Sequence, residues 1–91
     1  MKPLPQVVHC YRRTPEFSES TIPSGLTSAH RTKSGTWGKI VVVEGTLRYE
    51  IFEPVREEHE LDKEHPGVIE PQQLHTVEPI GKVRFYVEFY C

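Results

Sequence analysis

The chain has 91 residues, with 11 Lys and Arg against 13 Asp and Glu, which gives a formal net charge of −2. This length predicts one small domain over residues 1–91, with a modest core that a second subunit would enlarge. The scattered charges favour neither a nucleic acid nor an anionic membrane as a partner, and no apolar run reaches the roughly 18 residues that span a bilayer.

The start of the chain predicts a cytoplasmic protein. Its first five residues, MKPLP, contain no apolar stretch of the kind that a secretory signal has. Cys10 and Cys91 lie near opposite ends of the sequence and form no C-x-x-C motif. We therefore expect two free thiols, as is usual in a reducing compartment.

The N-terminal third predicts short strands only. Prolines at positions 3, 5, 15 and 23 exclude a long helix there, and strands are expected at residues 7–11 and near residues 29–31. The second of these strands carries His30, within the sequence SAHRTKSG.

Residues 37–52 predict a β-hairpin. β-branched and aromatic residues lie on both sides of Glu44-Gly45, which would form a two-residue loop. In that register Lys39 faces Glu50, an opposite-charge pair that supports the alignment. One face would then be fully apolar and line the interior of a barrel, with Ile40, Val42, Leu47, Tyr49 and Ile51.

The second half of the chain predicts a charged loop followed by further strands. Residues 54–66, PVREEHELDKEHP, read as a solvated loop, and short strands follow at residues 67–70 and 75–78. Residues 82–90 predict a central strand with large rings on both faces, and Glu88 lies between Tyr86 and Tyr90. Many short strands with Pro and Gly turns predict an all-β, jelly-roll barrel.

Three residues are candidates for chemistry: His30, His75 and Glu88. Two imidazoles and one carboxylate could hold a divalent metal (zinc, iron or manganese) inside a barrel, with positions left open for a substrate. Each has an alternative: a hydrogen-bonded core histidine, a loop histidine, and an acid paired with an arginine or a tyrosine hydroxyl. Glu70 could support such a site from behind its ligands or lie on the surface.

Several segments together resemble the small cupin-like domain of tellurite-resistance proteins, which precedes a methyltransferase in some members and stands alone in others. The resemblance covers nearly the whole chain. The matching segments are YRRTPEF at 11–17, HRTKSGTWG at 30–38, EGTLRY at 44–49, IEPQQLH at 69–75 and VEFYC at 87–91.

The resemblance implies a cupin jelly roll, or double-stranded β-helix, with a metal site inside. His30 stands near the histidines of the first cupin motif, and His75 stands at the histidine of the second. The first motif lacks its second histidine, and Gly38 occupies the position of its glutamate. Glu88 could replace that lost carboxylate from another strand.

The expected function is a cupin-like, metal-binding protein of the tellurite-resistance family that binds or transforms a small molecule. Tyr49, Tyr86 and Trp37 would shape its pocket, and a homodimer is expected because a small barrel that keeps edge strands often dimerises through them. The sequence does not decide whether the site is catalytic. One alternative is a non-catalytic ligand-binding or regulatory module without tightly bound metal. Another is a structural partner of a methyltransferase.

Overall fold

Two long strands, β3 (Trp37–Ile51) and β6 (His75–Tyr90), organise the fold in the computed structural model, which describes residues 1–91. They pair antiparallel along their whole lengths, from Trp37 opposite Tyr90 to Ile51 opposite His75. β-branched and aromatic residues dominate both strands, as a pleated surface covered on one face requires.

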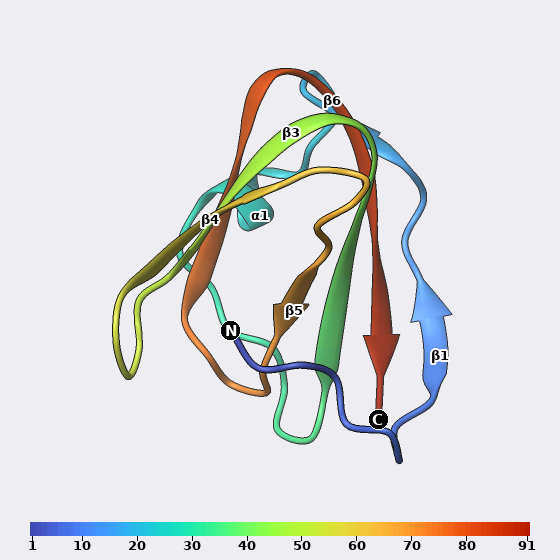
Figure 1. The fold of residues 1–91 in the computed structure, drawn as a ribbon, viewed down its shortest axis with the longest axis vertical. Coiled ribbons are helices and arrows are strands. Elements are labelled where there is room, and N and C mark those ends of the chain that lie inside the picture. Colours follow the sequence, from blue (N-terminus) through green and yellow to red (C-terminus); the bar gives the residue numbers. More distant parts are fainter.

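Both strands bend at a glycine, and the bend gives the sheet a concave face. Gly45 in β3 has a φ of 82° and Gly81 in β6 has a φ of 67°, a backbone region that other residues rarely adopt. The pairing register shifts between Val42 and Glu44 and again between Gly45 and Thr46, as in a β-bulge. Figure 1 shows β3 and β6 arching over together, so that the two halves of one sheet face each other.

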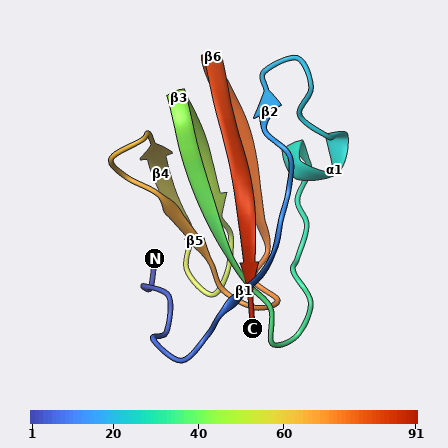
Figure 2. The ribbon, with the colours of Figure 1, turned by 90° about the vertical axis from the view of Figure 1, so that its right-hand side faces the viewer.

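Four shorter strands extend the sheet on either side of this central pair. β1 (Cys10–Arg13) and β2 (Phe17–Ser18) pair with the second half of β6. β5 (Gly67–Ile69) pairs with the first half of β3, and β4 (Glu57–Leu61) pairs with its second half. Figure 2 shows β4 and β5 on one side of the central strands, with β2 and the one-turn helix α1 (Ser24–Thr27) on the other.

The core lies on the concave face, between the two halves of the bent sheet. The hydroxyl of Tyr49, from the second half of β3, donates a 2.9 Å hydrogen bond to the carbonyl of Val68 in β5. The apolar face predicted from the sequence is therefore confirmed as core. Its eleven buried members are Ile40, Val42, Leu47, Tyr49, Ile51, Leu61, Ile69, Val77, Val83, Phe85 and Val87.

The all-β class is confirmed, but the sheet is open, and a closed jelly-roll barrel is not what these strands form. The predicted hairpin at Glu44-Gly45 is wrong, because β3 continues through both residues as one strand. Lys39 faces Glu88 of β6, and Glu50 is opposite Thr76. A two-residue hairpin loop needs positive φ at its first residue, and Glu44 does not have it, so the positive φ of Gly45 bends the strand without reversing it.

The other predicted elements agree in part. Residues 54–66 contain β4, whose alternation ends in the buried Leu61, so they are not only a solvated loop. The strand expected near residues 29–31 is a single bridge between His30 and His75. The outer face of β6, with Tyr86, Glu88 and Tyr90, is half-buried and has no second layer over it. The chain contains no helix with the length and apolar character needed to cross a membrane.

Candidate ligand pocket

His30 and His75 are neighbours, held together by their own backbones. Each backbone N–H donates a 3.0 Å hydrogen bond to the carbonyl of the other residue. The imidazole centroids lie 4.1 Å apart, with 58° between the ring planes. This bridge joins the segment before β3 to the first residue of β6, so two distant parts of the sequence present adjacent imidazoles.

The hydrogen bonds of both rings define where their protons lie. Nδ1 of His75 is 2.7 Å from the carbonyl oxygen of Gln73, and Nδ1 of His30 is 2.9 Å from that of Ser28. A carbonyl oxygen can only accept, so each Nδ1 must carry the proton and donate. In the neutral rings each Nε2 is then a hydrogen-bond acceptor, and neither makes a hydrogen bond within the protein.

His75 is buried and neutral. It is 1% exposed, and the ring of Tyr49 packs edge-on against it at a centroid distance of 5.8 Å. Burial lowers the pKa of His75 from its ordinary 6.5 to about 4, and the hydrogen bond to Gln73 opposes that effect only in part. The nearby His30 lowers the pKa further. At neutral pH the ring therefore offers an uncharged acceptor.

Both histidines line a cavity of about 360 Å³ on the concave side of the sheet, a volume within the range of small-molecule sites. The N-terminal segment forms one wall, and Phe17 of β2 packs edge-on against Phe85 of β6 with ring centroids 5.7 Å apart. The lining residues are Tyr11, Arg12, Thr14, Phe17, Leu26, His30, Arg31, Thr32, Lys33, Thr36, Ile40, Ile69, His75, Val77, Phe85, Val87 and Phe89.

Glu88 lies on the opposite face of the sheet from this pocket. Its carboxylate is 3.3 Å from the Arg13 guanidinium and accepts a 3.0 Å hydrogen bond from the hydroxyl of Tyr90. Side chains alternate between the two faces of β6, and its buried residues all have odd numbers: 75, 77, 83, 85 and 87. His75 therefore lies on the core face, and the even-numbered Glu88 lies on the outer face. Tyr86 and Trp37 also lie on this outer face, away from the pocket.

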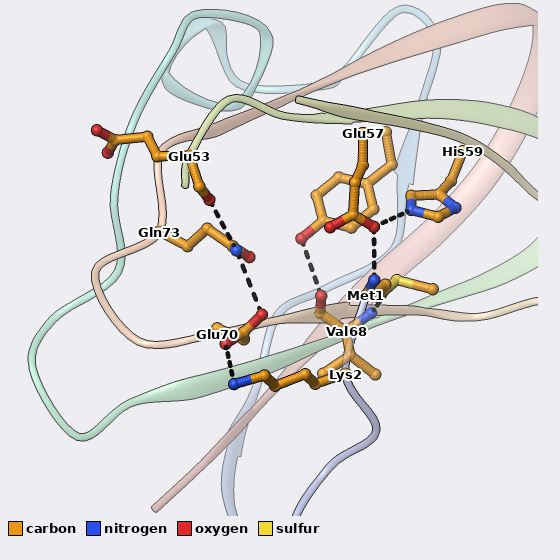
Figure 3. Close-up of polar contacts among 9 residues, drawn as sticks. Met1, Lys2, Glu53, Glu57, His59, Val68, Glu70 and Gln73 are labelled. Atoms are coloured by element: carbon orange, nitrogen blue, oxygen red, sulfur yellow. Dashed lines mark hydrogen bonds and ion pairs between the residues drawn. The ribbon is translucent and has the colours of Figure 1, made fainter. Parts of the chain in front are cut away.

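Glu70 and Tyr49 lie behind the pocket. The Glu70 carboxylate accepts a 3.2 Å hydrogen bond from the amide of Gln73, and Lys2 is 3.8 Å away (Figure 3). The same Gln73 amide donates to the carbonyl of Glu53. Gln73 therefore fixes the loop whose carbonyl orients His75, and Tyr49 supports the His75 ring from the core side.

The predicted metal site is wrong. No group of three or more His, Cys, Asp or Glu side chains is arranged to hold a metal ion. The two imidazoles lie together, but the pocket contains no carboxylate or thiolate, and Glu88 faces away from it. Two histidines alone are fewer protein ligands than zinc or non-haem iron sites use.

The cations at the pocket were not recognised from the sequence. Arg12 lies in the short strand β1, whose pairing register shifts between Cys10 and Arg12, and Lys33 lies outside any strand, so alternation does not assign either side chain to a face. The only available signal was charge: residues 30–33 read His-Arg-Thr-Lys, and Arg12 and Arg13 form the one basic doublet.

An open, bent sheet with a pocket on its concave face defines a small all-β domain. The sequence profile of the TehB-like domain matches residues 12–87. This chain belongs to the TehB-like domain family. The predicted link to tellurite-resistance proteins is confirmed at that level, and the match does not extend to the name cupin.

Two curated relatives come from Haemophilus influenzae, and both bear the name "Probable S-adenosyl-L-methionine-dependent methyltransferase TehB". The protein of strain Rd is 37% identical over 87 residues, and that of strain 10810 is 36% identical. In both cases the match covers 90% of this chain but 30% of the relative. The chain thus spans less than a third of the length of these methyltransferases.

Two crystal structures share the fold. TehB from H. influenzae superimposes with a TM-score of 0.85 and 32% identity, over 92% of this chain and 31% of TehB. A protein from Escherichia coli K12 gives a TM-score of 0.90 over 100% of this chain and 97% of its own length. Its identity is 21%, so it shows the fold alone.

The expected cofactor and function are corrected by these comparisons. The relatives are named for S-adenosyl-L-methionine, not for a divalent metal, and no metal-binding group exists here. A metal-dependent cupin activity is therefore the wrong description of this family member.

Proposed function

We propose that this domain binds a small organic molecule in the His30–His75 pocket and does not transform it. The observation that carries the proposal is that His30 and His75, joined by a backbone bridge, both line a largely apolar cavity and that neither Nε2 makes a hydrogen bond within the protein. A ligand that donates to one of these nitrogens would add a hydrogen bond inside an apolar cavity.

The chemistry of the lining supports binding over catalysis. No Ser, Cys, Asp, Glu or Tyr of the pocket pairs with either histidine as a nucleophile would pair with its base. Each Nδ1 donates to a main-chain carbonyl instead of to a carboxylate.

A fragment screen by ligand-observed NMR tests the proposal, with a pocket-filling variant as the reference. Thr36 lines the cavity and its side chain makes no hydrogen bond, so Thr36→Trp should fill the space. Thr76 lies on the outer face opposite Glu50, so Thr76→Trp is the matched control. We expect fragments that bind the wild type and Thr76→Trp but not Thr36→Trp. Fragments that bind all three proteins alike would contradict this pocket as the site.

A second candidate function is regulation of a methyltransferase, favoured by the relatives in which this domain is a part of such a protein. The cofactor S-adenosyl-L-methionine would then belong to the remaining two-thirds of the relative. The pocket presents three cationic side chains and no acid, which disfavours a ligand with a sulfonium and an ammonium group. Equilibrium dialysis with S-adenosyl-L-methionine tests this: uptake by the 91-residue domain would contradict it.

We also retain three expectations as proposals. The open sheet is a reduced form of the cupin jelly roll, supported by its concave, histidine-bearing face. The domain forms a homodimer through its exposed edge strands, which analytical ultracentrifugation would test. It works in the cytoplasm, because both thiols are free and exposed, as a reducing compartment allows.

A further inference from the structure

The exposed cations Arg12 and Lys33, which we call the mouth of the pocket, and the histidines His30 and His75, which we call its floor, together indicate the chemistry of a ligand. We infer, resting on the function proposed above, that the pocket takes an amphipathic organic anion. This ligand has a carboxylate or similar anion at one end, an apolar or aromatic body, and a hydrogen-bond donor such as a hydroxyl at the other end.

The distribution of charge around the pocket carries the first step. The chain has more acids than bases, 13 against 11, yet the pocket is lined by Arg12, Arg31 and Lys33 and by no Asp or Glu. Such segregation of one sign of charge around a cavity attracts a ligand of the opposite sign and raises its association rate.

Two of these cations are free to bind. Arg31 is already engaged, because its guanidinium binds the Glu53 carboxylate and donates to the carbonyl of Gln72. Arg12 and Lys33 are exposed and make no ion pair within the protein, although each of the other five arginines does. An anion at the mouth of the pocket would supply the partner that they lack.

The floor of the pocket carries the second step. His75 is 1% exposed, and beside it lies the half-buried His30, each with Nδ1 committed to a carbonyl and Nε2 without a partner. Because Nδ1 carries the proton of the neutral His75 ring, its Nε2 is an acceptor, and the group that meets it must donate. A hydroxyl or amine satisfies this requirement, and a second carboxylate does not.

The walls between floor and mouth are apolar. Ile40 and Phe85 are fully buried, and Val77, Val87 and Phe89 complete a surface suited to a ring or a short aliphatic chain. Aromatic walls favour an aromatic body through edge and face contacts.

Three matched probes test the inference by isothermal titration calorimetry. They are 4-hydroxyphenylacetate, its neutral amide, and phenylacetate, which lacks the hydroxyl. We expect 4-hydroxyphenylacetate to bind most tightly. Loss of the charge should weaken binding about tenfold, and loss of the hydroxyl about fivefold.

One double variant at the rim of the pocket locates the anion. Arg12→Gln combined with Lys33→Gln should weaken 4-hydroxyphenylacetate about fivefold and leave the neutral amide unchanged. Lys63→Gln is the control, because Lys63 is exposed and lies outside the pocket lining. It should change neither affinity.

The outcomes separate this inference from the proposed function. Equal affinities for the acid and the amide, or an unchanged affinity in the double variant, would overturn the inference and leave a neutral-ligand pocket. Pocket-dependent fragment hits that are all neutral would overturn it as well. If neither the three probes nor any fragment binds in a Thr36→Trp-sensitive way, the proposed function itself fails.

Discussion

The hydroxyl of Tyr49 and the carbonyl of Val68 join the two halves of the bent sheet with a 2.9 Å hydrogen bond. Tyr49 lies in the second half of β3, and Val68 belongs to β5, which pairs with the first half. The bond closes the concave core from within, and the Tyr49 ring also packs against His75. This residue therefore connects fold stability with the pocket.

Tyr49→Phe should lower the free energy of unfolding by about 1–2 kcal/mol, because it leaves the Val68 carbonyl without its donor in a half-buried place. Urea denaturation followed by circular dichroism measures the loss. Tyr90→Phe is the control, since its hydroxyl binds Glu88 on the outer face and should matter less. Equal losses in both variants would show that the Tyr49 bond has no special role.

Gly45→Ala should be among the most damaging single substitutions in the chain. A Cβ at this position would lie 2.1 Å from the Lys82 carbonyl oxygen, and φ is 82°. The added methyl group would clash with the backbone of β6, and alanine is strained at this positive φ. We therefore expect the free energy of unfolding to fall by about 3 kcal/mol, or the protein not to fold. Thermal unfolding measures the effect.

Two other glycines separate these causes. Gly81 also has positive φ, but a Cβ there would meet nothing within 4 Å, so Gly81→Ala should cost only about 1 kcal/mol. Gly25 has open space and ordinary φ, so Gly25→Ala should be neutral or slightly stabilising. An equal loss at positions 45 and 81 would exclude the backbone clash as the main cause.

Stability should fall as the pH is lowered from about 6.5 to about 4. Burial depresses the folded-state pKa of His75 to about 4, so in this window the unfolded chain binds a proton that the folded chain does not. The loss from this residue is on the order of 3 kcal/mol and levels off below pH 4. Urea denaturation at a series of pH values measures it.

His75→Asn should flatten that part of the pH profile, since Asn does not titrate and its amide can donate to the Gln73 carbonyl in place of Nδ1. His9→Asn, at an exposed position, should leave the profile unchanged. A wild-type profile that persists in His75→Asn would assign the pH dependence to other groups.

Glu88→Gln should change stability by no more than about 1 kcal/mol, because its ion pair with Arg13 lies on the partly solvated outer face. It should leave the affinity of the pocket for 4-hydroxyphenylacetate unchanged. Calorimetry checks the second point, and a lost affinity would mean that Glu88 reaches the pocket.

The sequence was sufficient to assign the core face but not the partner of each strand. Ile40 and Tyr49 share one face because side chains alternate along a strand, and this holds whether the strand turns or bends at Gly45. Alternation cannot decide whether the chain reverses direction at Gly45 to form a hairpin or continues as one bent strand. That depends on β6, which lies more than twenty residues away in sequence.

For the site, the sequence likewise indicated the residues involved but not how they are arranged in space. His30 and His75 could be selected as residue types, but their adjacency comes from a backbone bridge with no sequence signature. Glu88 was misassigned because residues 75–78 and 82–90 were treated as separate strands. Once they form one strand, the odd-numbered His75 and the even-numbered Glu88 must point to opposite faces.

The bend at Gly45 and Gly81 also determines how the molecule can come apart. β3 and β6 each run through both halves of the sheet, so each half depends on strands that it shares with the other. Dividing the chain at any point should therefore leave no fragment that folds alone. Unfolding should therefore be a single all-or-none transition. A destabilising substitution at the bend should therefore reduce ligand binding by lowering the fraction of protein that is folded, and should not distort the pocket locally.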